Sequence, residues 1–305
     1  MKIGFIGLGT MGQHMAWNLI EAGHELVVFD LRKEAADRHL KAGAVWADSP
    51  WGVADQTDVV FTSLPGPPEV ESVATGEAGL LAAMGPGKVY IDLSTNSPTV
   101  VRKLHGLFAA KGAEVLDAPV SGGPRGARTK KLSLWVGGDK ATYDRLLPVI
   151  QAIGDKPDYV GPIGAGSVAK LVHNCAGYAI QTALAEVFTM GVKAGVEPLA
   201  LYKAVRNGAQ GRRRTFDGMI ENFLPHTFDP ASFMLKLAHK DVTLATALGR
   251  EVNVPMRVAN LALADLTEAL NRGWGDRDSR VAMVLQEERA GVEVRVPADQ
   301  LADLD

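Results

Sequence analysis

The feature that most constrains this chain is a glycine-rich turn near its first residues. Directly after the apolar run Lys2–Gly7, the sequence reads Gly7-Leu8-Gly9-Thr10-Met11-Gly12, a G-x-G-x-x-G pattern. A helix-patterned stretch, Gly12–Ala22, follows it. Glycines at these spacings let a strand turn tightly into a helix that packs closely against it. The chain is therefore expected to begin with a strand–turn–helix unit.

Short apolar runs recur through the first half of the chain and alternate with Ala-rich stretches of helical length. They are Glu25–Asp30, Val59–Leu64, Val89–Leu93, Glu114–Ala118 and Leu132–Val136. Each run is too short for an ordinary helix, and its composition is typical of a buried strand. Strands that alternate with helices predict an α/β domain with a doubly wound, mostly parallel sheet, known as a Rossmann domain.

The second half of the chain has helical patterning throughout. A long apolar stretch, Gly166–Gly195, precedes four further helix candidates: Glu197–Asn207, Thr215–Phe223, Ser232–Glu251 and Val258–Arg272. We expect a Rossmann domain over residues 1–163 and an all-α domain over residues 164–290. Residues 291–305 are polar and contain Pro297, so we expect them to form a tail that lies loosely on the surface.

Composition excludes several classes of protein. Of the 305 residues, 47% are apolar and the formal net charge is -3, which argues against disorder and against a nucleic-acid partner. Arg212, Arg213 and Arg214 form the one basic cluster that stands out. No uninterrupted apolar run reaches the roughly 18–20 residues that span a membrane.

The single cysteine, Cys175, cannot form an internal disulfide, so the cytoplasm is the expected location. We expect Cys175 to be a small buried apolar side chain. His, Cys and carboxylate residues do not cluster with the spacing of metal ligands, and no metal is expected.

The glycine turn and Asp30 together predict a dinucleotide site. Asp30 follows Gly7 by 23 residues and ends the second predicted strand, where a carboxylate accepts hydrogen bonds from ribose hydroxyls. It would repel the 2′-phosphate of NADP, so NAD is the expected cofactor. Arg32 is the reason to keep NADP as the alternative, because its guanidinium can pair with that phosphate.

Two later segments have groups suited to substrate chemistry. In Asp117–Gly123, the hydroxyl of Ser121 and the backbone N–H groups of Gly122 and Gly123 suit a carboxylate. The alternative is an ordinary turn. In Gly164–Asn174, Lys170 and Asn174 are four residues apart on one helix face, as an acid–base lysine and a substrate-binding amide would be. The alternative is a surface lysine, and His173 is interpreted as a packing or supporting residue.

A third segment, Phe233–Asp241, carries Lys236 and Lys240 four residues apart on a predicted helix. Pattern alone also fits an amphipathic helix with a charged outer face.

The four segments, in this order, resemble the β-hydroxyacid dehydrogenase family, which includes 3-hydroxyisobutyrate dehydrogenases and tartronate semialdehyde reductases. The resemblance implies an NAD-dependent oxidoreductase that interconverts a small anionic 3-hydroxy acid and its semialdehyde or keto acid. It implies Lys170 as the catalytic residue and homodimers or homotetramers formed through the helical domain. It also implies two sets of contacts: to substrate, Ser121, Gly122, Gly123, Asn174 and Lys240; to the cofactor, Leu64, Pro65, Thr95, Phe233 and Lys240.

Departures from the family pattern leave alternatives open. His173 beside Asn174 is similar to 6-phosphogluconate dehydrogenases, but Gly177 stands where those enzymes carry a glutamate. Imine reductases share the fold and usually lack the lysine. A dinucleotide sensor without turnover is a further alternative. Arg212 is the residue of its cluster that we expect to bind a distal anion of the substrate, the alternative being a solvated basic turn.

Overall fold

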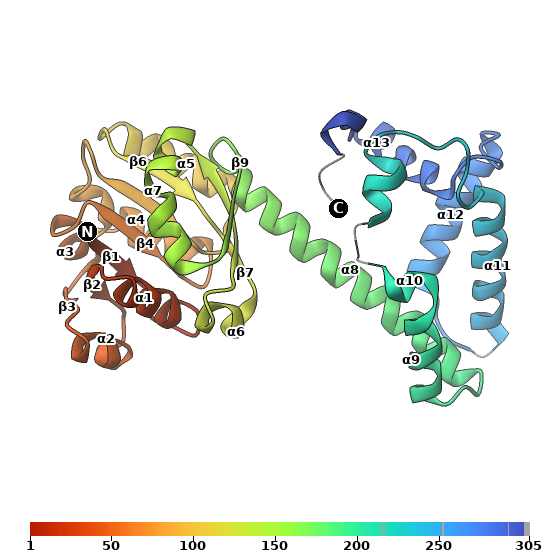
Figure 1. The fold of residues 1–305 in the computed structure, drawn as a ribbon, viewed down its shortest axis with the longest axis horizontal. Coiled ribbons are helices and arrows are strands. Elements are labelled where there is room, and N and C mark those ends of the chain that lie inside the picture. Colours follow the sequence, from red (N-terminus) through yellow and green to blue (C-terminus); the bar gives the residue numbers. More distant parts are fainter. Residues whose placement is uncertain (214, 216, 252, 292, 302–305) are drawn as a thin grey trace. The chain divides into compact units, whose positions relative to one another are not determined.

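The computed structural model describes residues 1–213, 215, 217–251, 253–291 and 293–301. Within helices α8 and α11, the description excludes the side chains of residues 181, 182, 185, 237, 240, 241, 244, 245, 247, 248 and 251. The chain forms two compact units, Met1–Ala176 and Gly177–Asp305, and each is described by itself (Figure 1).

One twisted sheet forms the centre of the first unit. Its strands are β1 (Lys2–Ile6), β2 (Glu25–Phe29), β3 (Val45–Trp46), β4 (Val59–Thr62), β5 (Val89–Asp92), β6 (Glu114–Asp117), β7 (Val120–Ser121), β8 (Ser133–Gly138) and β9 (Lys156–Gly161). The order is β3-β2-β1-β4-β5-β6-β8-β7, and β9 also pairs with β8. Every pair from β3 to β6 is parallel, whereas β8 runs antiparallel to β6 and β7. The predicted mostly parallel sheet is confirmed.

Helices cover both faces of this sheet. On one face, α1 (Gly12–Glu21), α6 (Gly123–Arg128) and α7 (Lys140–Ile153) pack on one apolar cluster. On the other face, α3 (Pro50–Asp55), α4 (Pro67–Thr75) and α5 (Pro98–Ala109) pack on a second cluster. A short helix, α2 (Asp37–Lys41), follows β2. Side chains such as Leu19 and Phe108 are fully buried, and each such burial stabilises the fold by roughly 1.5–3 kcal/mol. The sheet is therefore doubly wound.

Three of these strands were not predicted from the sequence. β3 and β7 have only two residues each, which is too short to show a periodic pattern. β9 contains Pro157 and Asp158, so it does not read as an apolar run. Its residues alternate between exposed and partly exposed, as expected for a strand at the edge of a sheet.

The second unit is helical, as predicted. The long helix α8 (Ala165–Lys193) starts in the first unit and continues into the second. The other helices are α9 (Pro198–Asn207), α10 (Ala209–Arg212), α11 (Leu235–Glu251), α12 (Arg257–Asn271) and α13 (Val284–Ala290). Their apolar core is built from Phe223, Phe228, Leu235, Ala269, Val281 and Leu285.

Two predicted helices differ in the structure. Within the described part of Thr215–Phe223, we find a five-residue π-helical turn, Met219–Phe223, and Pro225 lies just beyond it. The helix predicted from Ser232 begins at Leu235 instead. The reason is that the backbone N–H groups of Ser232 and Phe233 donate to the buried carboxylate of Asp278, at 3.1 and 3.2 Å.

The tail after Gly291 is held more firmly than we expected. The backbone N–H of Val296 donates to the carbonyl of Leu224 at 2.8 Å, and that of Val294 donates to Glu287. Leu301 is 8% exposed. The described part of the tail therefore packs on the second unit.

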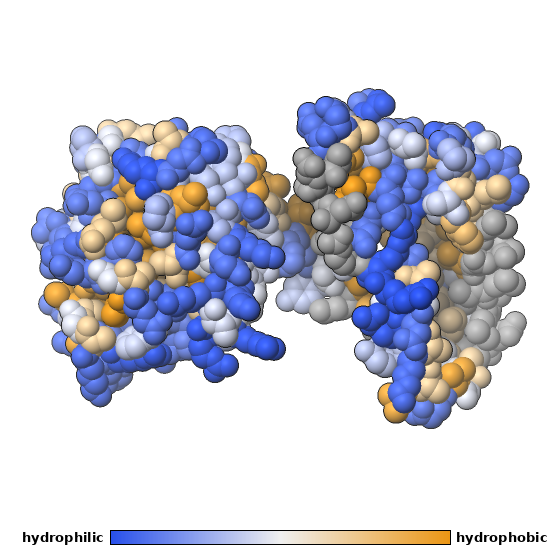
Figure 2. Space-filling model, in the orientation of Figure 1, coloured by the Kyte–Doolittle hydropathy of each residue, from blue (hydrophilic) through white to orange (hydrophobic). Residues whose placement is uncertain are grey.

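Figure 2 shows that the visible surface of the first unit is mostly hydrophilic, with only small apolar areas. In the described part of the chain, no helix combines the length and the apolar character that a membrane span requires.

Candidate active site

The glycine turn has the geometry that a dinucleotide phosphate requires. Gly7 has a φ of 91°, a conformation that residues with a side chain rarely adopt. A Cβ atom at Gly12 would overlap the carbonyl of Gly7, so only glycine lets α1 approach this closely. At Gly9 a Cβ atom would meet nothing within 4 Å. This open space lies beside the start of α1, where free N–H groups and the helix dipole favour an anion.

Asp30 is fixed at the end of β2 by the same turn. Its Oδ2 atom accepts a hydrogen bond from the N–H of Leu8 at 2.7 Å, and its Oδ1 atom accepts one from the N–H of Arg32 at 2.9 Å. A carboxylate can accept about four hydrogen bonds, so each oxygen keeps capacity for a ribose hydroxyl.

A pocket of about 750 Å³ joins these elements. It is lined by the glycine turn, by Phe29–Arg32 at the end of β2, by Ser63–Pro65 after β4 and by one side of α4. Strand order reverses between β1 and β4, and this is the place where open α/β sheets bind ligands. The residues present therefore fit a nicotinamide dinucleotide.

The predicted nicotinamide contacts rest on a buried polar cluster. Asp92, at the end of β5, accepts hydrogen bonds from Thr62 Oγ1 (2.9 Å), the N–H of Ser94 (3.0 Å) and Asn96 Nδ2 (2.9 Å). Ser94 Oγ in turn accepts from the N–H of Leu64 at 2.9 Å. Burial raises the pKa of Asp92, and these donors oppose the shift. The cluster thus fixes both loops that carry the predicted contacts Leu64, Pro65 and Thr95.

Lys170 lies on the second turn of α8, which is anchored to the sheet. Asp117 Oδ1 accepts from the N–H of Gly164 at 2.8 Å, and its Oδ2 accepts from the N–H of Ser167 at 2.6 Å. Lys170 Nζ donates to the carbonyl of Val120 at 2.8 Å and lies 5.9 Å from the ring centroid of Trp135. The side chain is partly buried, and this desolvation lowers the pKa of Lys170. A lysine that transfers protons near neutral pH needs a pKa lowered in this direction.

The substrate segment lies against the same helix. Ser121 follows the carbonyl that Lys170 contacts, and Ser121 Oγ is 3.3 Å from Nε2 of His173. Gly122 and Gly123 have φ values of 132° and 61°, which turn the backbone sharply between β7 and α6. The structure therefore brings together the Ser121–Gly123 turn and the α8 segment that carries Lys170, His173 and Asn174.

One prediction in this segment is wrong. Cys175 is exposed rather than buried. It lies two residues beyond His173, about 200° around the helix, so it points away from the strand that His173 contacts.

The predicted residues of the second unit are described within that unit only. Phe233 is 44% exposed, and its backbone is fixed by Asp278. Arg212 is exposed at the end of α10, and Arg213 forms an ion pair with Glu221. Lys240 lies on α11, but its side chain is outside the described residues, as is Arg214.

Comparisons with known proteins agree with this geometry. Residues 2–161 match the family model of the NAD-binding domain of 6-phosphogluconate dehydrogenase, and residues 164–285 match the NAD-binding model of NADP-dependent 3-hydroxyisobutyrate dehydrogenase. The chain is 35% identical to 2-(hydroxymethyl)glutarate dehydrogenase of Eubacterium barkeri, over 96% of this chain and 97% of the relative. It is also 35% identical to NAD-dependent L-serine dehydrogenase of Pseudomonas aeruginosa, over 93% and 97% of the two chains.

A solved structure extends the comparison to three dimensions. The Mycobacterium tuberculosis 3-hydroxyisobutyrate dehydrogenase determined with L-serine is 31% identical, with a TM-score of 0.65 over 93% of this chain and 98% of that one. The chain belongs to the β-hydroxyacid dehydrogenase family. This β-hydroxyacid dehydrogenase is an NAD(P)-dependent oxidoreductase that acts on CH–OH groups.

Several residues of the candidate site in this β-hydroxyacid dehydrogenase were missed by sequence reasoning. Leu31 is 93% exposed on the rim of the dinucleotide pocket, and Pro68 and Val73 line it from α4. Trp135 lies beneath Lys170 and His173. The position of Leu31 directly after Asp30 was an available signal, but nothing local distinguishes Trp135 from a core residue of β8.

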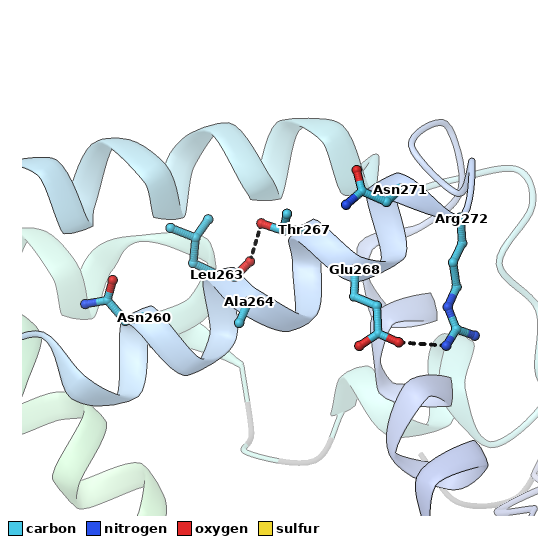
Figure 3. A pocket seen from close by; sticks show the side chains of 7 residues that line it. All are labelled: Asn260, Leu263, Ala264, Thr267, Glu268, Asn271 and Arg272. Carbon is cyan, nitrogen blue, oxygen red and sulfur yellow. Dashed lines mark hydrogen bonds and ion pairs between the residues drawn. The ribbon is translucent and has the colours of Figure 1, made fainter.

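A second hollow, of about 610 Å³, lies along α12 in the second unit (Figure 3). The described residues that line it belong to α12 and to Arg272 directly after it. They include Asn260, Thr267 and Glu268, and Glu268 is paired with Arg272 at 2.7 Å. Among the residues whose side chains the structure describes, no predicted site residue lines this hollow, so we do not assign the dehydrogenase chemistry to it.

Proposed function

We propose that this enzyme catalyses the reversible oxidation of a small 3-hydroxy acid to its semialdehyde or keto acid, with NAD as cofactor and Lys170 as general acid–base. The observation that carries this proposal is the position of Lys170. Its Nζ is partly buried, 2.8 Å from the carbonyl of Val120, on the residue that precedes Ser121. A proton-transfer group thus lies next to a turn suited to a carboxylate.

The bound cofactor would supply the hydride acceptor. The chain's own residues then have separate tasks. The Ser121 hydroxyl and the N–H groups of Gly122 and Gly123 bind the substrate carboxylate, and Asn174 holds its hydroxyl. The neutral amine of Lys170 takes the proton of that hydroxyl at Nζ during oxidation and returns it during reduction. Loss of hydration lowers the pKa of Lys170, which increases the neutral fraction that the oxidation needs.

NAD is proposed over NADP because of Asp30. Its carboxylate is held at the end of β2 by the N–H groups of Leu8 and Arg32, so it cannot turn away freely from a 2′-phosphate. Arg32 lines the same pocket and is the residue through which NADP would be accommodated if this assignment fails.

The names of the relatives narrow the substrate class. L-serine, 2-(hydroxymethyl)glutarate and 3-hydroxyisobutyrate all carry a hydroxymethyl group on the carbon next to a carboxylate. We assign the same unit to the substrate of this chain. Arg212 is proposed to bind a second anion if the substrate has one, because Arg213 is paired with Glu221.

The lysine is tested with Lys170→Ala. NAD affinity should remain near that of the wild type, and kcat should fall by about two to four powers of ten, the usual contribution of general acid–base catalysis. Lys140→Ala is the matched control, because Lys140 is an exposed lysine of the first unit paired with Asp144.

The substrate panel is 3-hydroxyisobutyrate, L-serine, glycerate, threonate, 2-(hydroxymethyl)glutarate, a sulfonated diol and 6-phosphogluconate. If Lys170→Ala turns over the best acid of this panel at nearly the wild-type rate, Lys170 is not the general acid–base.

A further inference from the structure

We infer that His173 is a positioning residue that makes Ser121 a hydrogen-bond donor to the substrate carboxylate. The inference rests on the proposed function, which places that carboxylate at Ser121–Gly123. It concerns a residue that the proposed reaction does not otherwise use.

Two contacts orient the imidazole of His173, which is exposed. Its Nε2 atom lies 3.3 Å from Ser121 Oγ, and its ring centroid lies 5.0 Å from that of Trp135 with the planes tilted by 46°. The helix beneath it is anchored through Ser167, whose N–H donates to Asp117. The same indole of Trp135 also faces Lys170. His173 is thus held in place against the substrate turn, one helical turn after the acid–base lysine.

The proton on Nε2 of His173 decides whether Ser121 can donate to the substrate carboxylate. The Ser121 hydroxyl has one hydrogen, and a carboxylate can only accept hydrogen bonds. If Nε2 of His173 has no proton, the Ser121 hydrogen points to the imidazole, and only oxygen lone pairs face the substrate anion. If Nε2 carries a proton, it donates to Ser121 Oγ, and the Ser121 hydrogen is free to point to the carboxylate. A bound carboxylate therefore favours the state of His173 with a proton on Nε2.

The kinetic test compares His173→Leu with His173→Gln. Leucine removes the hydrogen bond, whereas the glutamine amide can offer an N–H near the place of Nε2. With the best acid of the panel, His173→Leu should raise KM about tenfold, the effect of weakening one hydrogen bond to a charged group. It should leave kcat and the KM for NAD within about threefold, and His173→Gln should recover most of the loss.

A double-mutant cycle shows whether His173 acts through Ser121. Ser121→Ala alone should raise the same KM by a similar factor, and adding His173→Leu should change it less than twofold further. A full tenfold additional loss in the Ser121→Ala background contradicts the inference. So does a KM for His173→Leu within twofold of the wild-type value.

An independent measurement uses no turnover. In protein labelled with ¹⁵N-histidine, the ¹⁵N shifts of His173 report which ring nitrogen carries the proton. Propionate, which has the carboxylate and lacks the hydroxyl, should shift His173 toward the form protonated at Nε2, and Ser121→Ala should abolish that response. A His173 signal that saturating propionate leaves unchanged contradicts the inference. If the panel shows no oxidation but propionate gives this shift, the proposed reaction fails and the role of His173 stands.

Discussion

Lys170 combines a partly buried ammonium with a single backbone acceptor. Loss of hydration disfavours its charged form and lowers its pKa from the ordinary value near 10.4. Because oxidation needs the neutral amine, kcat/KM for oxidation should rise with pH and level off below pH 10.4. For reduction, which needs the protonated form, it should fall over the same range. Initial rates measured in both directions give these two pH dependences of kcat/KM, and Lys170→Arg should show neither. If kcat/KM for oxidation levels off only at or above pH 10.4, burial does not lower the pKa of Lys170.

Asp30 allows a test of cofactor choice that keeps the glycine turn intact. Asp30→Asn retains an oxygen that can accept from the N–H of Leu8 and removes the negative charge. Two unit charges 4 Å apart interact by about 4 kcal/mol near a protein surface, so the ratio of kcat/KM for NAD to that for NADP should fall by at least about tenfold. Asp48→Asn, at an exposed carboxylate bonded to Trp46, is the control. A wild-type enzyme that prefers NADP would instead assign the 2′-phosphate to Arg32.

The carboxylate of Asp92 joins the ends of β4 and β5, and its hydrogen-bond donors are all buried. Asp92→Ala leaves the hydroxyl of Thr62, the N–H of Ser94 and the amide of Asn96 without their acceptor. The Thr62 hydroxyl can turn to Tyr90 Oη at 3.0 Å, so two donors stay without a partner. Buried donors without an acceptor cost about 1–3 kcal/mol each, so we expect a loss of about 2–6 kcal/mol in the free energy of unfolding. Denaturant unfolding of the first unit measures it. Asp144→Ala, which removes an exposed pair with Lys140, should change stability by less than about 0.5 kcal/mol.

The loop after β5, which Asp92 holds, also carries the predicted cofactor contact Thr95, so a change at Asp92 should affect the KM for NAD. Asp92→Asn keeps the shape and one acceptor oxygen, so it should fold and lose less stability than Asp92→Ala. Since Thr95 is exposed between the buried residues Ser94 and Asn96, a loosened loop should raise the KM for NAD more than the KM for the acid. Equal stability of Asp92→Ala and the wild type would show that the cluster does not hold these loops.

Element by element, the sequence predicted what has a long or repeated pattern. The six longer apolar runs of the first half became strands, and Gly166–Gly195 became α8. What it missed depends on pairing across the sheet: β9 is a strand because it lies beside β8, although Pro157 and Asp158 are poor strand formers. The start of α11 was misplaced because Asp278, more than forty residues later, accepts the N–H groups of Ser232 and Phe233.

The candidate site follows the same rule. Gly7, Asp30 and Lys170 could be predicted as site residues because each belongs to a local sequence motif. Asp92 and Trp135 act through contacts that exist only in the folded sheet, and in sequence they resemble any strand residue.

At the scale of the molecule, apolar side chains remain exposed on α8 and α9. In the second unit they include Leu184, Val187, Leu199, Tyr202 and Val205. The family resemblance implies assembly through the helical domain, and exposed apolar side chains are suited to it. Light scattering after size exclusion should give two or four times the chain mass of 32.4 kDa. Leu199→Glu combined with Tyr202→Lys should lower that mass, whereas Leu107→Glu, at an exposed leucine of α5, should not. A monomeric wild type contradicts the expectation.

Three strands of the sheet end on, or directly before, an aspartate whose oxygens bind the backbone of a loop. Asp30 after β2 holds the N–H groups of Leu8 and Arg32, Asp92 of β5 holds that of Ser94, and Asp117 of β6 holds the start of α8. Main-chain positions are thereby set by carboxylates to which the proposed reaction assigns no contact with the substrate. The side chains that project from these loops can therefore be substituted during evolution without a change in the main-chain positions. One inherited scaffold can in this way give rise to enzymes for different hydroxy acids.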